Sequence, residues 1–182
     1  MQASAFTIDE NNQPLGIRGD EPLDCQPQTV LKSGLLIHPT VMGRTSWFRA
    51  NPYDSVFVRA EDQELWVRAC QTTVFGRLQD PLFFYRESLV GNLGNYLRTA
   101  RTVRKILRVY GPPMVGRGRT AMLLARSHLK SAAFWMCTKV GWQGRLIQRR
   151  VRGLNRAEIE AATSAIREIL QTRLPGASQG GV

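Results

Sequence analysis

Two adjacent carboxylates, Glu61 and Asp62, stand at the start of a short helix predicted over residues 60–71. Leu65 and Trp66 follow and give this helix an apolar face that it would bury against the rest of the protein. A carboxylate held at the edge of a core can accept a proton from a bound hydroxyl, which is general-base chemistry. The alternative is purely structural, because the positive end of a helix dipole favours acidic side chains in the first turn.

Hydrophobic periodicity and turn residues predict the elements that would position this acid pair. We expect a strand over 4–9, a turn over 10–16, a loop over 19–27, a helical turn over 29–33, a strand over 35–44 and a short helix over 45–50. After the 60–71 helix, we expect strands over 74–78 and 82–86 and a helix from about residue 89 to 110, ended by Gly111-Pro112-Pro113. A glycine-rich join, a helix over 120–140 and a last helix from the N-cap Asn155 to Thr172 complete the chain.

The acid pair lies between two other motifs. His-Pro-Thr-Val-Met-Gly-Arg occupies residues 38–44, Ala-Glu-Asp-Gln-Glu-Leu-Trp-Val-Arg occupies residues 60–68, and Pro-Leu-Phe-Phe-Tyr-Arg occupies residues 81–86. These three blocks, in this order, resemble the acceptor-binding half of family 2 glycosyltransferases of the GT-A fold. The resemblance covers about residues 3–110, and the ordered combination is more specific than any one block.

The resemblance implies an α/β fold and a function. We expect residues 1–110 to form a partial GT-A-type mixed sheet with flanking helices, residues 111–173 a basic helical extension, and residues 174–182 a disordered tail. The implied activity is inverting, nucleotide-sugar-dependent glycosyl transfer in the assembly of cell-envelope polysaccharide or lipopolysaccharide. The implied acceptor is a sugar or a lipid-linked sugar.

The resemblance also assigns roles to individual residues. Asp62 maps to the base that deprotonates the acceptor, and Glu61 would orient acceptor hydroxyls. A cleft for acceptor and donor would include His38, Thr40, Arg44 and Trp66. Packing roles remain open for His38 and Trp66, and Arg44 could meet a phosphate or simply be solvated.

The sequence departs from the family in its donor-binding elements. It contains no Asp-x-Asp motif and no glycine-rich phosphate loop before a helix. Intact family enzymes use a nucleotide-sugar donor and a divalent cation, Mg²⁺ or Mn²⁺, held by an N-terminal half. We therefore expect a truncated or split chain that binds no cofactor and catalyses little alone, and whose partner is a separate N-terminal half.

Cysteine and histidine offer no metal site in this sequence. The three cysteines are far apart, and they show no metal-ligand spacing with the two histidines; these residues are Cys25, Cys70, Cys137, His38 and His128. We therefore expect no metal bound by these side chains.

Charge is divided unevenly along the chain, whose formal net charge is +11. Residues 1–97 hold 8 basic and 11 acidic side chains, a balance of −3, and residues 98–182 hold 17 and 3, a balance of +14. No acid occurs between Glu87 and Glu158. This asymmetry predicts an anionic partner, either nucleic acid or lipid headgroups.

The helix over 120–140 favours the lipid alternative. Its apolar stripe is flanked by Arg119, Arg126 and Lys130, as in helices that lie on anionic membranes; the stripe comprises Met122, Ala125, Leu129, Ala132, Met136 and Val140. The other interpretation is that this stripe packs on the core. No apolar run reaches the ~18 residues that cross a bilayer, so we expect a cytoplasmic protein, peripheral on the inner face of the cytoplasmic membrane. A nucleic-acid-binding protein or a non-catalytic helper is the alternative function, and nucleic acid is disfavoured because no known binding motif is present.

Overall fold

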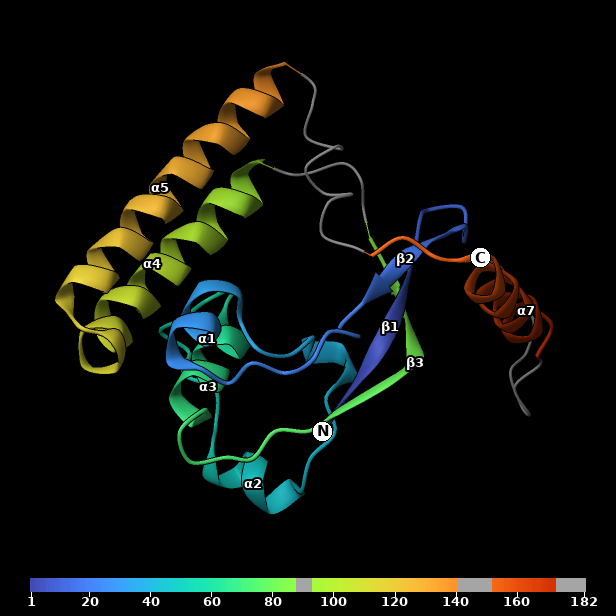
Figure 1. Ribbon diagram of the computed structural model, residues 1–182, viewed down its shortest axis with the longest axis horizontal. Coiled ribbons are helices and arrows are strands. Elements are labelled where there is room, and N and C mark those ends of the chain that lie inside the picture. Colours follow the sequence, from blue (N-terminus) through green and yellow to red (C-terminus); the bar gives the residue numbers. More distant parts are fainter. Residues whose placement is uncertain (88–92, 141–151, 173–182) are drawn as a thin grey trace.

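A three-stranded mixed sheet and a set of helices give the protein an α/β fold. The computed structural model describes residues 1–87, 93–140 and 152–172 (Figure 1). Strand β1, Gln2–Ile8, is central, with β2, Pro14–Arg18, antiparallel on one side and β3, Arg77–Arg86, parallel on the other. The parallel pairing of β1 with β3 requires a long crossover, and residues 19–76 supply it.

The β1–β2 hairpin is closed by the predicted turn. The Oδ1 atom of Asp9 accepts the backbone N–H groups of Asn11 and Gln13, both at 2.8 Å, and Asn12 adopts a positive φ of 60°. Asparagine tolerates this left-handed conformation better than most residues. The second strand begins at Pro14, inside the segment that the sequence predicts to be turn.

The prediction of two strands over 74–78 and 82–86 is wrong, because β3 is one continuous strand. Pro81 lies within it, although proline cannot donate a ladder hydrogen bond. The strand tolerates Pro81 because β3 is an edge strand of the sheet. The pairing with β1 also shifts register on both sides of Ser4, where Ser4 pairs with Pro81.

The predicted strand over 35–44 is also wrong. This segment forms a single 3₁₀ turn, η1, His38–Thr40, between the short helices α1, Pro27–Ser33, and α2, Thr45–Ala50. Pro39 fixes φ and removes a donor, which suits a tight turn better than a strand. The side chain of Gln2 accepts the Ile37 N–H at 3.1 Å. Of the predicted strand, one isolated antiparallel bridge is observed, between Val41 and Gln2.

Helix α3, Glu61–Ala69, confirms the predicted helix and lies at the centre of the main core. Leu65 and Trp66 are fully buried, where they meet side chains of α1 and of α4, Leu93–Val115; the partners with the least exposure are Val30, Leu31, Ile106 and Leu107. Burial of such side chains supplies the main stabilising free energy of the fold. It also fixes α3 relative to both neighbouring helices.

Helices α4 and α5, Arg117–Lys139, form an antiparallel hairpin beside α1 and α3 (Figure 1). The predicted end of the first helix at Gly111-Pro112-Pro113 is wrong, because α4 continues to Val115 and crosses the predicted domain boundary at residue 110. The carbonyls that would accept from the two prolines belong to exposed residues, Arg108 and Val109, so water can satisfy them. The turn is made by Gly116, whose φ of 80° favours glycine.

Helix α7, Arg156–Gln171, covers the sheet on the side away from the hairpin (Figure 1). Its predicted N-cap is confirmed, since the Asn155 side chain accepts the Glu158 N–H and Glu158 accepts the Asn155 N–H. Ala162 packs on Phe6 and Ile17 of the sheet. The predicted disordered tail over 174–182 lies outside the described residues. Within the described ranges, no helix has an apolar stretch long enough to cross a membrane.

A buried carboxylate joins three segments of the main core. The sequence predicts an i, i+4 surface pair between Glu64 and Arg68, but the Glu64 side chain is 0% exposed. Arg68 binds its carboxylate through two nitrogens, at 2.9 and 3.2 Å, and donates to the Pro52 carbonyl at 2.8 Å. The hydroxyl of Tyr110 on α4 donates to Glu64 Oε1 at 2.5 Å. Because the Glu64 charge is buried, its partners are essential to its stability.

We expect Tyr110→Phe to lower the free energy of unfolding at pH 7 by about 1.5–3 kcal/mol, the contribution of a hydrogen bond to a charged group. Burial and the bond to Glu64 raise the pKa of Tyr110 to about 12, against about 10 in the unfolded chain. The neutral phenol therefore stabilises the fold below pH 10, and this contribution is lost as the pH rises from 10 to 12. Urea unfolding of the wild type and of Tyr110→Phe between pH 7 and pH 12 measures the difference between their free energies of unfolding, which should become smaller as the pH rises above 10.

Tyr96→Phe is the control, because it also removes a phenol on α4 but leaves the Glu64 contacts intact. A Tyr110→Phe protein as stable as the wild type at pH 7 would contradict the role of this hydrogen bond.

Candidate functional site

The start of α3 opens into a cavity of about 580 Å³, called here the carboxylate cavity. Its walls are residues 33–39 after α1, residues 59–63 around the start of α3, and the Trp66 ring, with Arg18, Tyr85 and Thr99 completing them. The structure therefore brings Glu61, Asp62, His38 and Trp66 to one place. Segments far apart in the sequence meet there because η1 and β3 both contact β1, while α3 is held by the main core.

The acid pair occupies the first turn of α3, as predicted. Ala60 precedes the helix and has no side chain to cap it, so the first-turn N–H groups receive no side-chain acceptor. Glu61 and Asp62 are both partly exposed residues, whereas Glu64 in the same turn is buried.

A tyrosine and a histidine face this acid pair from the preceding loops. The Tyr53 hydroxyl and His38 Nε2 are 2.7 Å apart, and their rings meet edge to face with centroids 5.7 Å apart. Partial burial, followed by the negative charges of Asp62 and Glu61, raises the pKa of Tyr53. Tyr53 therefore remains a neutral phenol that can donate or accept a hydrogen bond near the carboxylates.

Two buried polar atoms of this site have no hydrogen-bond partner among the described residues. They are Oε2 of Glu61 and the indole Nε1 of Trp66. An unsatisfied buried polar group costs about 1–3 kcal/mol, so such atoms require an explanation. One of these atoms is an acceptor and the other a donor, and both belong to α3.

Trp66 belongs to a rigid aromatic cluster behind the cavity. Its ring stacks on Trp47 with centroids 6.4 Å apart and meets Phe75 edge to face at 6.0 Å. The Trp47 indole is fixed in turn by a 3.0 Å hydrogen bond to Thr73 Oγ1. This packing restricts the orientation of Trp66, so its predicted packing role and its place in the cavity wall are compatible.

Two residues that the sequence places in the cleft lie outside the cavity. Thr40 uses its hydroxyl to bond the Ile37 carbonyl at 2.9 Å, within the 3₁₀ turn. Arg44 is exposed and immediately precedes α2, where its carbonyl accepts the Trp47 and Phe48 N–H groups. Both differences follow from the absence of the predicted strand, which would have carried these residues toward the cavity.

The cavity also contains residues that sequence reasoning missed. Arg59 lies two residues before Glu61 and has a positive φ of 70°, which is uncommon for a residue with a side chain. Gln63 and Tyr85 line the cavity as well. The sequence could have indicated Arg59 as a cavity residue, because it lies close to the two carboxylates in the chain. It could not have indicated Tyr85, because nothing in the sequence shows that β3 approaches α3.

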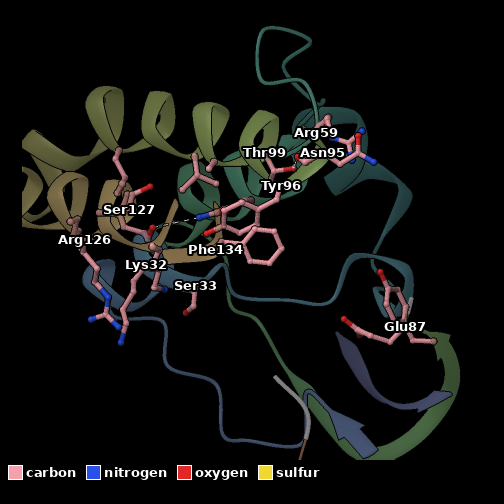
Figure 2. A pocket seen from close by; sticks show the side chains of 18 residues that line it. Lys32, Ser33, Arg59, Glu87, Asn95, Tyr96, Thr99, Arg126, Ser127 and Phe134 are labelled. Carbon is pink, nitrogen blue, oxygen red and sulfur yellow. Dashed lines mark hydrogen bonds between the residues drawn. The ribbon is translucent and has the colours of Figure 1, made fainter. Parts of the chain in front are cut away.

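The three basic residues predicted to contact a membrane or anion divide into two groups. Arg119 is exposed on α5. Arg126 and Lys130 line a second cavity of about 610 Å³ between α1, α4 and α5, called here the basic cavity (Figure 2). The two cavities adjoin, because Ser33, Arg59, Gln63, Tyr85 and Thr99 line both.

Known proteins provide no assignment for this site. Comparison with protein-family models, with curated proteins and with solved structures finds no match to this chain. Within residues 1–87, 93–140 and 152–172, no three His, Cys, Asp or Glu side chains are grouped as a metal site would require. The candidate site is thus a polar cavity with two carboxylates and two unsatisfied polar atoms, and the basic cavity adjoins it.

We expect Asp62→Asn to lower the pKa of Tyr53, because it removes a negative charge that disfavours the phenolate. The pKa should stay above the ordinary value of about 10, since partial burial, the largest cause of the shift, is unchanged. An NMR titration of the Tyr53 ring carbon measures it. Asp80→Asn, the same change at an exposed site on β3, is the control. An unchanged Tyr53 pKa in Asp62→Asn would show that this carboxylate does not face Tyr53.

Proposed function

We propose that this chain is the acceptor-binding part of an inverting, nucleotide-sugar-dependent glycosyltransferase of the GT-A type. The observation that carries the proposal is the convergence of Glu61, Asp62 and Trp66 with His38 on one cavity. The ordered sequence blocks that resemble family 2 glycosyltransferases supply the reaction class. A cavity of about 580 Å³ is within the range that encloses small ligands.

Asp62 acts as the general base in this proposal. Its carboxylate takes the proton of the acceptor hydroxyl while the hydroxyl oxygen forms a bond to the anomeric carbon of the donor sugar. The bond from that carbon to the nucleotide diphosphate breaks on the opposite side, and the diphosphate leaves with the electron pair. Glu61 orients the acceptor, because its carboxylate can accept a hydrogen bond from a second acceptor hydroxyl, and Trp66 forms part of the cavity wall.

In this proposal, a separate nucleotide-binding half binds the donor and its cation. The carboxylate cavity does not fit a metal ion by itself, because no group of three ligands surrounds it in the described part of the chain. No step is therefore assigned to Mg²⁺ or Mn²⁺ on these residues. The acceptor is a sugar or lipid-linked sugar of cell-envelope polysaccharide or lipopolysaccharide assembly.

The outer face of α5 supports attachment to an anionic membrane. The predicted apolar stripe does not pack on the core: Met122, Leu129, Met136 and Val140 are each between 55% and 71% exposed. Arg119, Arg126 and Lys130 follow this face along one edge. Together α4 and α5 carry ten basic side chains and no acid. An apolar surface with cationic edges complements the inner face of the cytoplasmic membrane.

The same surface makes nucleic acid a poorer partner. Non-specific nucleic-acid binding uses a basic groove with aromatic rings on which bases stack. Here Phe134 is buried against Tyr96, and the exposed centre of the α5 outer face is aliphatic rather than basic, with the half-exposed Trp135 ring beside it covered by Lys139. The observed distribution therefore fits lipid better than a phosphodiester chain.

Asp62→Asn should reduce glycosyl transfer by about 10²–10⁴-fold, the usual contribution of a general base. The assay uses this chain joined to a nucleotide-sugar-binding half and follows radiolabelled sugar from a panel of nucleotide sugars. Glu61→Gln should chiefly raise KM for the acceptor, because its proposed role is orientation. Asp80→Asn should retain full activity. Full transfer by Asp62→Asn would refute the assignment of the base.

Leu129→Glu should abolish flotation of the protein with vesicles of phosphatidylcholine and phosphatidylglycerol, because it places a charge in the centre of the α5 outer face. Binding by wild type should weaken with added salt, since each basic residue near the surface contributes about 1 kcal/mol electrostatically. Leu82→Glu on β3 is a matched control, because the two leucines are 71% and 68% exposed. Equal flotation of both variants would remove the membrane proposal.

A further inference from the structure

The basic cavity lies directly beside the carboxylate cavity and differs from it in charge. Lys32 comes from α1, Arg59 from the loop before α3, and Arg126 and Lys130 from α5. Figure 2 shows Arg126 toward one end and Arg59 with Asn95 toward the other, with the Tyr96 and Phe134 rings between them. Cationic groups from three separate elements thus surround one space of about 610 Å³.

Negative charge does little to balance Lys32, Arg59 and Arg126. The acidic residue that lines the cavity is Glu87, and its carboxylate is held by Arg18 in a 3.0 Å ion pair. Within the described part of the chain, no carboxylate lies in ion-pair contact with Lys32, Arg59 or Arg126. The basic cavity is therefore a region of positive potential lined by exposed cationic side chains, and such a region attracts anions.

A further cation stands behind the cavity wall. Arg104 on α4 is only 8% exposed, and its Nη1 atom donates to Ser131 Oγ at 3.1 Å and to Ser127 Oγ at 3.4 Å. Ser127 itself lines the cavity. In the described residues no carboxylate pairs with this guanidinium, and buried charges are normally paired. An anion in the basic cavity would lie close to this uncompensated charge, because Ser127 both lines the cavity and bonds Arg104.

Arg59 connects the two cavities because its side chain lines both. The loop that carries it is held on α4: Thr102 Oγ1 donates to the Val58 carbonyl at 2.7 Å, and Lys105 Nζ donates to the Val56 carbonyl at 3.4 Å. Arg59 is thus placed between the acid pair and the other cations by a fixed backbone. A guanidinium there can bind a phosphate through two N–H groups.

We propose that the basic cavity binds the phosphate or diphosphate group of the acceptor, while the acceptor sugar lies in the carboxylate cavity with its hydroxyl toward Asp62. The placement of the sugar rests on the proposed function, whereas the anion site does not. The acceptor class is then a sugar linked to phosphate or diphosphate, either free or attached to a lipid. Arg126 and Lys130 border both the cavity and the α5 outer face, so a phosphate at the membrane surface could reach this site.

Calorimetric titration with inorganic pyrophosphate and with glucose 1-phosphate tests the anion site, with methyl glucoside as the uncharged control. Wild type should bind both anions saturably at 150 mM NaCl. Arg59→Asn and Arg126→Gln should each weaken binding about tenfold or more, as expected for loss of a charged hydrogen bond. Asparagine is chosen at position 59 because it tolerates the positive φ.

Arg49→Gln is the matched control, because Arg49 is an exposed arginine on α2 that lines neither cavity. Weakening of binding by Arg49→Gln equal to that by Arg126→Gln would overturn the site, since it would show only general attraction of anions. Absence of saturable binding by folded wild type would overturn it as well. Asp62→Asn should retain pyrophosphate binding, so an inactive base variant that still binds anion separates this site from the catalytic proposal.

Vesicles distinguish the two sources of the phosphate. Phosphatidylcholine vesicles containing phosphatidic acid, a phosphomonoester, are compared with vesicles containing phosphatidylglycerol at equal surface charge. A preference for phosphatidic acid that Arg59→Asn removes supports a lipid headgroup in the site. Equal binding to both vesicles, together with tight binding of glucose 1-phosphate, supports a free sugar phosphate. If transfer depends on Asp62 but neither phosphate source binds, the anion site is wrong and the proposed transferase function remains.

Discussion

The buried carboxylate of Glu64 is the constraint on which the arrangement of this protein depends. Its charge is compensated by Arg68 on the same helix and by the Tyr110 hydroxyl on α4, and Arg68 also holds the Pro52 carbonyl. Removing the charged partner of a buried ion pair typically costs about 3–5 kcal/mol. The three contacts therefore lock α3 to α4 and to the loop that carries Tyr53. Because Glu64 lies one turn from Glu61, locking it also determines where the acid pair points.

One turn of helix thus carries three carboxylates in two different environments. Glu64 is enclosed by partners, whereas Glu61 and Asp62 face a cavity that supplies no cation in ion-pair contact with them among the described residues. The next turn adds Trp66, whose ring packs into the aromatic cluster while its Nε1 has no partner there. The same short helix therefore contributes to folding and to the candidate site. Glu64 and the Trp66 ring anchor it in the core, and Glu61 and Asp62 remain available for chemistry.

The sequence predicts best the elements whose signals are local. The acidic first turn and apolar face of α3, the Asn155 N-cap of α7 and the turn after β1 are confirmed, because short-range contacts decide them. The errors lie near prolines, at residues 35–44, 74–86 and 111–115, where packing or edge position overrides the local preference of the backbone. The cavity shows the same limit: Asp62 and His38 could be predicted to meet only through a family resemblance, and Tyr85 reaches them only because β3 pairs in parallel with β1.

The distribution of charge explains why an anion would benefit the fold itself. The α4–α5 hairpin has ten basic side chains and no acid, and like charges at this density repel one another. Water and salt screen the exposed basic side chains. Arg104 is buried, and its guanidinium donates hydrogen bonds to the hydroxyls of Ser127 and Ser131. Burial, followed by the positive charges of Arg108 and Arg101, lowers the pKa of Arg104. A ligand that binds only the folded state stabilises it in proportion to its occupancy. An anion between Arg126 and Arg59 would relieve this repulsion and join the hairpin to the loop before Asp62, so binding and order at the carboxylate cavity would be coupled.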